Sequence, residues 1–218
     1  MMKKASELID LTSHTGEHPR MGATDVVPFI PVENISMKEC VQLARELGQR
    51  VGDELQIPVY LYEEAATRPD RKNLANVRKG QFEGLREEIG VNPDRNPDYG
   101  PHHIHPTAGA TAIGARFFLI AYNVNLHSQD LTLAKRIAKK VRESSGGFHC
   151  VKALGLELKE KNIVQVSMNM TNYMVTSLAT VYTAIQEEAE KEGVSVLESE
   201  LIGFVPREAL TDTAIEFL

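Results

Sequence analysis

Apolar residues recur at helical spacing in two parts of the first half of this chain. Residues 2–11 carry the pattern without any capping residue, which predicts the tail of a helix whose beginning is missing. Residues 36–55 repeat it behind Ser36 and Glu39, a spacing typical of a capping box. We therefore expect an amphipathic helix over 36–55. Its apolar stripe consists of Cys40, Leu43, Ala44, Leu47, Val51 and Leu55.

Two apolar runs in the same half predict strands. Residues 25–32 are rich in Val, Ile and Phe, but Pro28 and Pro31 remove backbone donors, so this strand is expected at a sheet edge or interrupted. Residues 57–62 are typical of a buried strand. Residues 63–99 are charged and rich in turn formers, so we expect short helices in a long surface or functional loop.

The second half alternates strands and helices in a regular order. Strands are predicted at 115–126, 149–160, 162–170 and 194–206, and helices at 128–144 and 175–193. A tight turn is expected at Lys161 and Asn162. This βαββαβ order gives, in its simplest topology, an antiparallel four-stranded sheet with two helices on one face. We therefore expect a ferredoxin-like second half, and an α/β first half with fewer strands than such a unit needs.

The composition is that of a globular protein, and it argues against a nucleic-acid-binding protein, a membrane-spanning protein and a disulfide-rich protein. Its 218 residues, 42% of them hydrophobic, can form one large domain or two small ones. The net charge is −6, and Lys and Arg are scattered along the sequence without the basic cluster that is typical of nucleic-acid binding. No apolar run approaches the roughly 20 residues of a membrane-spanning helix. Cys40 and Cys150 lie far apart without zinc or disulfide spacing, so a reducing cytoplasm is expected.

Two histidines, His14 and His18, form the first candidate site. On a helix this spacing could bind a metal ion, but Gly16 and Pro19 oppose a regular helix. His18 is then presented from a loop between acidic and basic neighbours, and an imidazole with a pKa of about 6.5 is suited to proton transfer there. Spacing alone leaves metal binding, proton transfer and a turn histidine bonded to the backbone all open.

A histidine-rich and then glycine- and alanine-rich segment, residues 99–116, is the second candidate. Its histidines have no carboxylate or cysteine among them, and alternation would separate His102 from His103 and His105, which disfavours a metal site. The small residues that follow would let another group approach the backbone. We expect a loop that cradles a flat heteroaromatic or anionic ligand. The pattern is neither GxGxxG nor a Walker loop.

A third candidate is the pair Asn123 and Asn125, which would lie on one face of a strand among apolar neighbours. Hydrogen bonding across the sheet and contact with a substrate explain two such amides equally well. The remaining charge-rich helices are expected to be solvated faces.

Four stretches carry a resemblance to a known family. They are HTGEHPRMGATDVVPFIPV, IPVYLYEEAA, YGPHHIHPTAGATAIGARFFLIAYNVNL and VQVSMNMTNY, and they closely resemble the glutamate formiminotransferase family, also found as a domain of formiminotransferase-cyclodeaminase. The resemblance implies transfer of the formimino group of N-formimino-L-glutamate to N5 of tetrahydrofolate in histidine degradation. It also implies an N-terminal subdomain at 1–118 and a C-terminal one at 119–218, both of βαββαβ type and the first incomplete.

The resemblance also implies roles for individual residues. His18, in the motif Glu-His-Pro-Arg-Met-Gly, matches the catalytic histidine and would take the proton from folate N5 as that nitrogen attacks the formimino carbon. The folate-binding stretch matches Gly100, Pro101, His102, His103, Ile104, His105, Pro106, Thr107, Ala108 and Gly109. Arg20 is expected to bind a substrate carboxylate, because it lies near His18 and can bind in a bidentate way. His14 has no assigned role.

Compared with the family pattern, we expect this chain to lack the first strand, helix and hairpin of the first subdomain and to stop in the helix begun at 206. Tetrahydrofolate is the expected co-substrate, and no metal is expected. The expected partners are N-formimino-L-glutamate and folate, without nucleic acid or membrane, and the expected assembly is a homodimer in the cytoplasm.

Three other functions stay open at this point. One is a relative that moves a formyl group between glutamate and tetrahydrofolate, because donors that differ by one atom are not distinguished by these residues. The second is a folate-binding fragment without catalysis. The third is a metal-dependent hydrolase that uses the five histidines of the two clusters.

Overall fold

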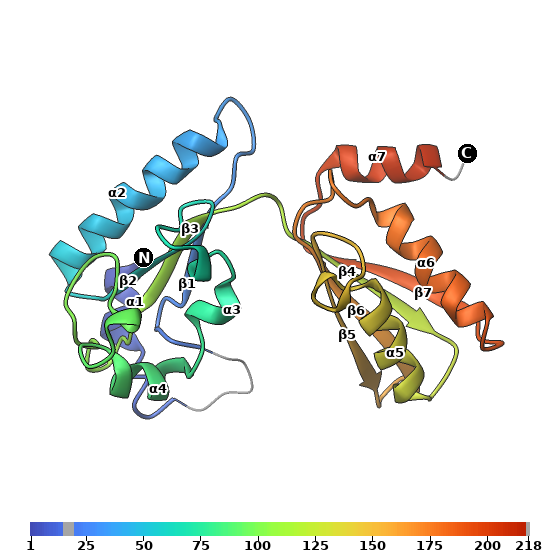
Figure 1. Cartoon of the computed structure of the whole chain (residues 1–218), viewed down its shortest axis with the longest axis horizontal. Helices are drawn as coiled ribbons and strands as arrows, with labels where there is room; N and C mark the ends of the chain where they lie inside the picture. Colours follow the sequence, from blue (N-terminus) through green and yellow to red (C-terminus); the bar gives the residue numbers. More distant parts are fainter. Residues whose placement is uncertain (15–19, 217–218) are drawn as a thin grey trace. The chain divides into compact units, whose positions relative to one another are not determined.

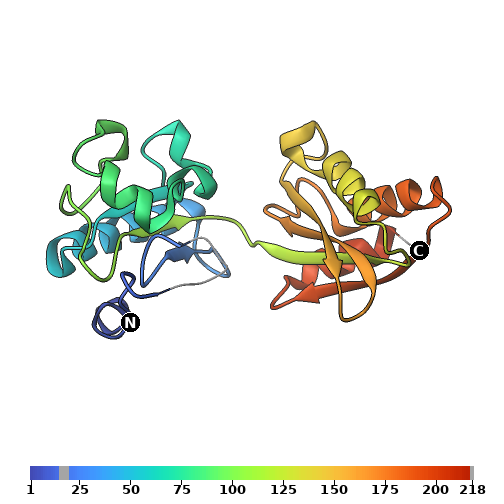
Figure 2. The same ribbon diagram turned by 90° about the horizontal axis from the view of Figure 1, so that it is seen from below.

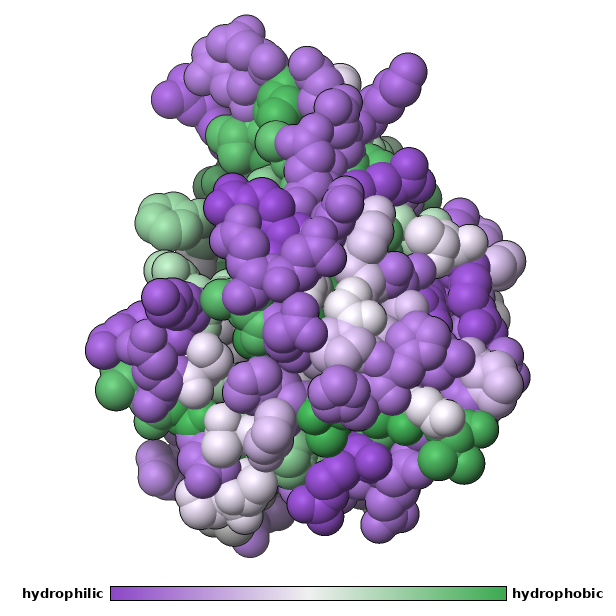
Figure 3. Space-filling view, turned by 90° about the vertical axis from the view of Figure 1, so that its left-hand side faces the viewer, coloured by the Kyte–Doolittle hydropathy of each residue, from purple (hydrophilic) through white to green (hydrophobic). Residues whose placement is uncertain are grey.

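The computed structural model describes residues 1–14 and 20–216 and forms two compact units (Figure 1). The first unit is Met1–Arg116 and the second is Phe117–Leu218. The division thus falls at Arg116, where the sequence led us to expect a boundary after residue 118. The face shown in Figure 3 is mainly hydrophilic, with apolar groups in scattered patches.

The first unit is built on a parallel three-stranded sheet of order β1-β3-β2. Its strands are β1 (Val26–Phe29), β2 (Val59–Glu63) and β3 (Thr111–Ala115). The edge position of β1 confirms the expectation based on Pro28, which lies opposite Gly114 of the central strand. Parallel strands of one sheet need crossover connections, and α2 (Met37–Leu55) lies in the connection from β1 to β2, the two strands that flank β3. The predicted α/β class is confirmed, but the sheet of this unit is parallel, whereas the sheet expected of a βαββαβ unit is antiparallel.

Helix α2 forms as the sequence predicted. The Ser36 hydroxyl accepts a hydrogen bond from the backbone N–H of Glu39, and the Glu39 carboxylate accepts one from the backbone N–H of Ser36, which completes the capping box. The buried side is made of Cys40, Ala44, Gly48, Val51 and Gly52. Leu43, expected in the apolar stripe, is instead 40% exposed. The N-terminal helix α1 (Met2–Leu8) has no side-chain cap, as predicted.

Apolar residues cover both faces of this sheet, as is usual for parallel strands. On one face, Val59, Leu61 and Ile113 pack against α2. On the other face, Tyr60 and Tyr62 pack against the short helices of the charged segment 63–99. These elements are η1 (Pro69–Arg71), α3 (Leu74–Val77), α4 (Gln81–Glu88) and η2 (Pro93–Arg95). The short helices expected in this segment are thereby confirmed.

The central strand β3 lies where the sequence led us to expect a ligand-binding loop. Thr111–Ala115 is buried throughout, and its small residues let β2 approach: a Cβ at Gly114 would lie 2.4 Å from the carbonyl oxygen of Tyr62. The expected strand at 115–126 was therefore wrong at its start, because β3 ends at Ala115 and β4 begins at Ile120. Residues 117–120 are all apolar, so the sequence pattern predicted one continuous strand across the connection between the two units.

The second unit confirms the predicted ferredoxin-like arrangement. Its elements are β4 (Ile120–Leu126), α5 (Leu131–Val141), η3 (Glu143–Ser145), β5 (Val151–Leu158), β6 (Ile163–Met170), α6 (Leu178–Glu190), β7 (Val196–Ile202) and α7 (Arg207–Glu216). The four strands pair antiparallel in the order β5-β6-β4-β7. Both α5 and α6 pack on one face of this sheet (Figures 1 and 2).

The expected boundaries in the second unit need two corrections. The helix predicted at 128–144 ends at Val141 and is followed by the 3-10 turn η3. The turn between β5 and β6 spans four residues, 159–162, and not the two that were predicted. Asn162 takes the left-handed conformation that closes this turn, with φ of +56°.

Substitution of Gly114 by Ala should destabilise the first unit, because the added Cβ would meet the Tyr62 backbone at 2.4 Å. Overpacking of this kind costs about 1–3 kcal/mol. Gly84→Ala is the matched control: a Cβ there meets nothing within 4 Å, and the change within helix α4 should stabilise by roughly 0.5–1 kcal/mol. Urea unfolding followed by circular dichroism measures both. Equal midpoints for the two variants would contradict the close β2–β3 packing.

Candidate functional site

The expected catalytic histidine, His18, lies outside the described residues, which resume at Arg20. The candidate site is therefore built from the residues on both sides of it and from the histidine-rich stretch 100–109. All of these residues belong to the first unit.

The structure brings the segment after His18 into direct contact with the end of the stretch 100–109. The backbone N–H of Ala110 donates to the carbonyl of Met21, and that of Ala23 donates to the carbonyl of Ala108, both at 2.9 Å. Gly22 lies opposite Gly109 in this short antiparallel pairing. Two constellations that are almost 90 residues apart in sequence thus share one backbone scaffold.

Glycine is required at both central positions of this pairing. A Cβ at Gly22 would lie 1.7 Å from the carbonyl oxygen of Ala110, and a Cβ at Gly109 would lie 2.3 Å from that of Met21. Gly109 also has a φ of +71°, a conformation that other residues rarely adopt. The glycine that the sequence suggested for ligand approach therefore first serves the approach of another backbone segment.

His105 is part of the turn that leads into this pairing. Its Nδ1 accepts a hydrogen bond from the backbone N–H of Ala108 at 3.0 Å, and its burial lowers the pKa of its imidazole. With Nδ1 as acceptor, the neutral ring carries its proton on Nε2. His102 and His103 are exposed, so of the three histidines these two are freely presented to solvent.

A buried ion pair fixes the chain just before Gly100. The Asp98 carboxylate accepts hydrogen bonds from Arg71 at 2.6 Å, from the backbone N–H of Leu61 at 2.8 Å, and from the Thr67 hydroxyl. The side chains of Asp98 and Arg71 are only 8% and 6% exposed. Arg71 also donates to the carbonyl of Asn96 at 2.5 Å. A buried pair is stable only when its hydrogen bonds are satisfied in this way.

The first residues of the stretch pack directly on helix α2. The backbone of Tyr99 pairs with Val59 at the start of β2. A Cβ at Gly52 of α2 would lie 2.6 Å from the backbone nitrogen of Gly100, so glycine permits this contact as well. The stretch 100–109 is therefore anchored at both ends, with its exposed histidines between the anchors.

Arg20 makes a bidentate ion pair with Glu83 at the start of α4. Its Nη2 and Nη1 lie 2.7 and 2.9 Å from the two carboxylate oxygens, and Nη2 also donates to the carbonyl of His14 at 3.1 Å. The Arg20 guanidinium lowers the pKa of the Glu83 carboxyl to about 2. The fork geometry that we expected to hold a substrate carboxylate is occupied here by a carboxylate of the protein itself.

The two asparagines of β4 belong to a cross-strand network in the second unit. Asn125 is fully buried, accepts from the amide of Gln165 at 2.8 Å and donates to Glu198 at 3.0 Å. Lys161 pairs with Glu198 and Glu200, and this ion pair lowers the pKa of Glu200. Of the two alternatives for Asn125, the structure shows hydrogen bonding across the sheet.

Sequence reasoning missed the residues that hold the candidate site together. Glu83, Asp98 and Arg71 lie in the charged segment 63–99, where their types are common and their spacing carries no motif. Their partners lie between 27 and 63 residues away along the chain. Only the fold identifies them.

No group of three or more His, Cys, Asp and Glu side chains within residues 1–14 and 20–216 is arranged to hold a metal ion. In the same part of the chain, no helix is long and apolar enough to cross a membrane. Cys40 and Cys150 are both free thiols.

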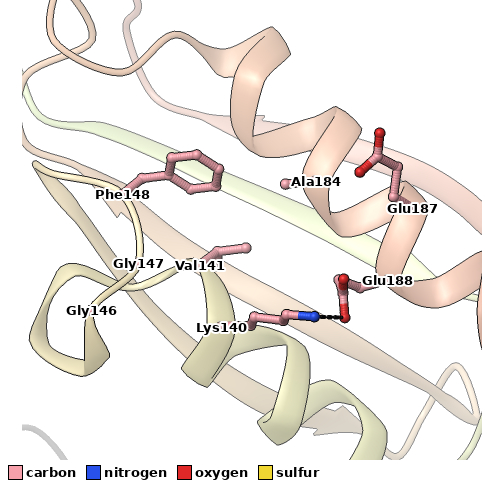
Figure 4. Close-up of a pocket in the computed structure, with 8 residues that line it drawn as sticks. All are labelled: Lys140, Val141, Gly146, Gly147, Phe148, Ala184, Glu187 and Glu188. Atoms are coloured by element: carbon pink, nitrogen blue, oxygen red, sulfur yellow. Dashed lines mark ion pairs between the residues drawn. The ribbon is translucent and has the colours of Figure 1, made fainter.

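A cavity of about 350 Å³ lies in the second unit between α5, the loop 146–148 and α6 (Figure 4). Its apolar wall includes Phe148 and Ala184, and Lys140 pairs with Glu188 across it at 2.6 Å. None of the expected site residues lines this cavity.

Comparison with known proteins gives matches along the whole chain. Residues 1–116 match the family model of the formiminotransferase domain, N-terminal subdomain, and residues 121–218 match that of the formiminotransferase domain. Glutamate formimidoyltransferase of Streptococcus pyogenes serotype M1 is 51% identical over 218 residues, which cover all of this chain and 73% of that protein.

Two further relatives extend this result. Glutamate formimidoyltransferase of Thermoplasma acidophilum is 50% identical, over all of this chain and 72% of that protein. Formimidoyltransferase-cyclodeaminase of Rattus norvegicus is 47% identical, over 97% of this chain and 40% of that protein.

Substitution of Asp98 by Asn should strongly destabilise the first unit. The change keeps the size of the side chain but leaves the charge of Arg71 buried without its partner, which costs about 3–5 kcal/mol. Asp70→Asn is the matched control, because Asp70 pairs with Arg68 at the surface and such pairs contribute about 0–1 kcal/mol. Chemical unfolding measures both variants. A loss at Asp98 no larger than that at Asp70 would contradict the anchoring role of the buried pair.

The Arg20–Glu83 pair should make stability depend on pH in the acid range. Because the folded carboxyl has a pKa of about 2, against an ordinary value of 4.5, the unfolded chain takes up this proton at higher pH than the folded chain. The stabilisation is therefore fully present above about pH 4.5 and is lost as the pH falls toward 2. The difference in unfolding free energy between the unmodified chain and Glu83→Gln should shrink over this interval. A difference independent of pH would contradict this linkage.

Proposed function

Because the chain belongs to the formiminotransferase family, we propose that it transfers the formimino group of N-formimino-L-glutamate to N5 of tetrahydrofolate. The products are 5-formiminotetrahydrofolate and L-glutamate, and the reaction is a step of histidine degradation. The observation that carries this proposal is the identity of about one residue in two to glutamate formimidoyltransferases over the entire chain.

His18 is proposed as the general base. As N5 attacks the formimino carbon, a new N–C bond forms and His18 takes the proton that N5 loses. When the tetrahedral intermediate collapses, the bond between that carbon and the glutamate nitrogen breaks, and the proton passes to the leaving amine. An imidazole with a pKa near 6.5 can accept and return a proton at neutral pH.

The stretch Gly100–Gly109 is proposed to bind the folate. Its anchoring supports this role, because a ligand loop held at both ends orients a bound group at little entropic cost. The buried Asp98–Arg71 pair precedes the stretch, and the Gly22–Gly109 pairing closes it. His102 and His103, exposed between these anchors, can offer hydrogen bonds to a heteroaromatic ring.

The same proposal includes a reaction without metal, a homodimer and a cytoplasmic location. Proton transfer by a histidine supplies the chemistry without a metal ion. Large exposed apolar side chains in the second unit, such as Phe204 and Ile202 at 98% and 57% exposure, support burial by a second copy. The two free thiols support a reducing compartment. Light scattering of the purified chain measures the assembly.

Substitution of His18 by Ala tests the proposed base. Loss of a general base typically lowers kcat by about 10² to 10⁴, whereas folate binding should stay largely intact because the stretch 100–109 is unchanged. His14→Ala is the matched control and should keep full turnover. The measurements are steady-state kinetics with tetrahydrofolate and calorimetry with folate.

Unchanged turnover of His18→Ala would overturn the assignment of the base. Assays with N-formyl-L-glutamate as donor test the alternative of formyl transfer, and faster turnover with that donor would replace the proposed substrate. Folate binding by the unmodified chain without any turnover would favour a binding protein. Loss of turnover in excess chelator would restore the metal-dependent alternative.

A further inference from the structure

We infer that Arg20 and Glu83 are positioning residues that hold the two ends of the segment carrying His18, and that Arg20 does not bind a substrate carboxylate. This inference rests on the proposed role of His18 and concerns how that residue is held. The contacts that support it all belong to described residues on either side of 15–19.

One guanidinium joins three points of the first unit. Arg20 Nη2 donates to the carbonyl of His14 at 3.1 Å, and both Nη atoms bind the Glu83 carboxylate. The carbonyl of Arg20 itself accepts from the backbone N–H of Phe82 at 3.0 Å. Position 14, position 20 and the first turn of α4 are thus tied together, and the five residues between 14 and 20 include His18.

The chain after Arg20 is held independently of this ion pair. The backbone N–H of Met21 donates to the Asp25 carboxylate at 2.7 Å, and Asp25 pairs with Arg78. Met21 also pairs with Ala110, as described above. Loss of the Arg20–Glu83 pair should therefore release the end at position 14 and leave the sheet and the stretch 100–109 in place.

Arg20 is poorly placed to receive a second carboxylate. Its side chain is only 15% exposed, and both of its terminal nitrogens already bind Glu83. Glu83 keeps its charge at neutral pH, since its pKa is about 2. A substrate carboxylate would have to displace a bidentate partner of the same chemistry that is held in place by the fold.

The two roles predict opposite kinetic behaviour. A positioning pair acts on the geometry of the base, so its loss lowers kcat and leaves the KM for N-formimino-L-glutamate almost unchanged. A binding arginine acts on substrate affinity, so its loss raises that KM. Removal of Glu83 separates the cases most sharply, because a binding Arg20 freed from Glu83 would bind the substrate better.

The experiment compares Arg20→Lys, Glu83→Gln and the double variant. Lysine keeps the charge but cannot reach both Glu83 oxygens and the His14 carbonyl with a planar fork. We expect each single variant to lower kcat by about 10-fold to 10²-fold, the scale of a small misplacement of a catalytic group. The KM for the formimino donor should change by less than about twofold. The double variant should be no slower than the slower single variant, because both remove one interaction.

Glu54→Gln is the matched control for these variants. Glu54 pairs with Arg50 on the exposed side of α2, so its loss removes an Arg–Glu pair of the same type away from the candidate site. Its kcat and KM should equal those of the unmodified chain. A raised KM for Arg20→Lys together with an unchanged or lowered KM for Glu83→Gln would overturn the inference, as would unchanged kcat in both.

A protease experiment separates this inference from the proposed function. Endoproteinase Glu-C cleaves after Glu17, and the fragment that begins at His18 identifies this cut by mass. Cleavage should be faster in Arg20→Lys and Glu83→Gln than in the unmodified chain and Glu54→Gln, because the first two variants lose the contacts that tie positions 14 and 20 to α4. Equal cleavage rates would overturn the positioning role. Absence of formimino transfer in the unmodified chain would instead overturn the proposed function alone.

Discussion

The first unit depends on the backbone pairing between residues 21–23 and 108–110. This pairing leads β1 and β3 into the sheet side by side, and the hydrogen bond from Ala112 to the carbonyl of Asp25 continues it into the parallel ladder. Gly22 and Gly109 permit backbones to approach at distances that no side chain would tolerate. Without this contact, nothing in the backbone would hold the segment after His18 next to the end of the stretch 100–109 and the start of the central strand.

The charged segment 63–99 is a scaffold rather than a decoration. It contributes Arg71 and Asp98 to a buried ion pair, Glu83 to the partner of Arg20, and Arg78 to the partner of Asp25. Buried ion pairs seldom add much net stability compared with apolar residues, but they tolerate few alternative arrangements. The charge of this segment therefore specifies where the neighbouring loops are held.

Sequence alone predicted the elements that have a strong local signal. Helix α2 has both a capping box and an apolar stripe, and the second unit has a strand and helix order that permits one simple topology. Strand β3 was missed because its small residues lack the alternation and bulk of a typical strand, and their burial depends on Tyr62 in another part of the chain. The motif around His18 was visible, but the partner of Arg20 was not, because 63 residues separate Arg20 from Glu83.

The hydrogen bond at His105 has a consequence for the path of protons through the histidine-rich stretch. Protonation of its Nδ1 would turn an acceptor into a donor and set it against the N–H of Ala108, 3.0 Å away. A chain of histidines can relay a proton only if each ring can take it on one nitrogen and release it from the other. With Nδ1 held as an acceptor by Ala108, His105 cannot take a proton on that nitrogen and release it from the other, so it cannot serve as a relay between His103 and the turn toward Gly109.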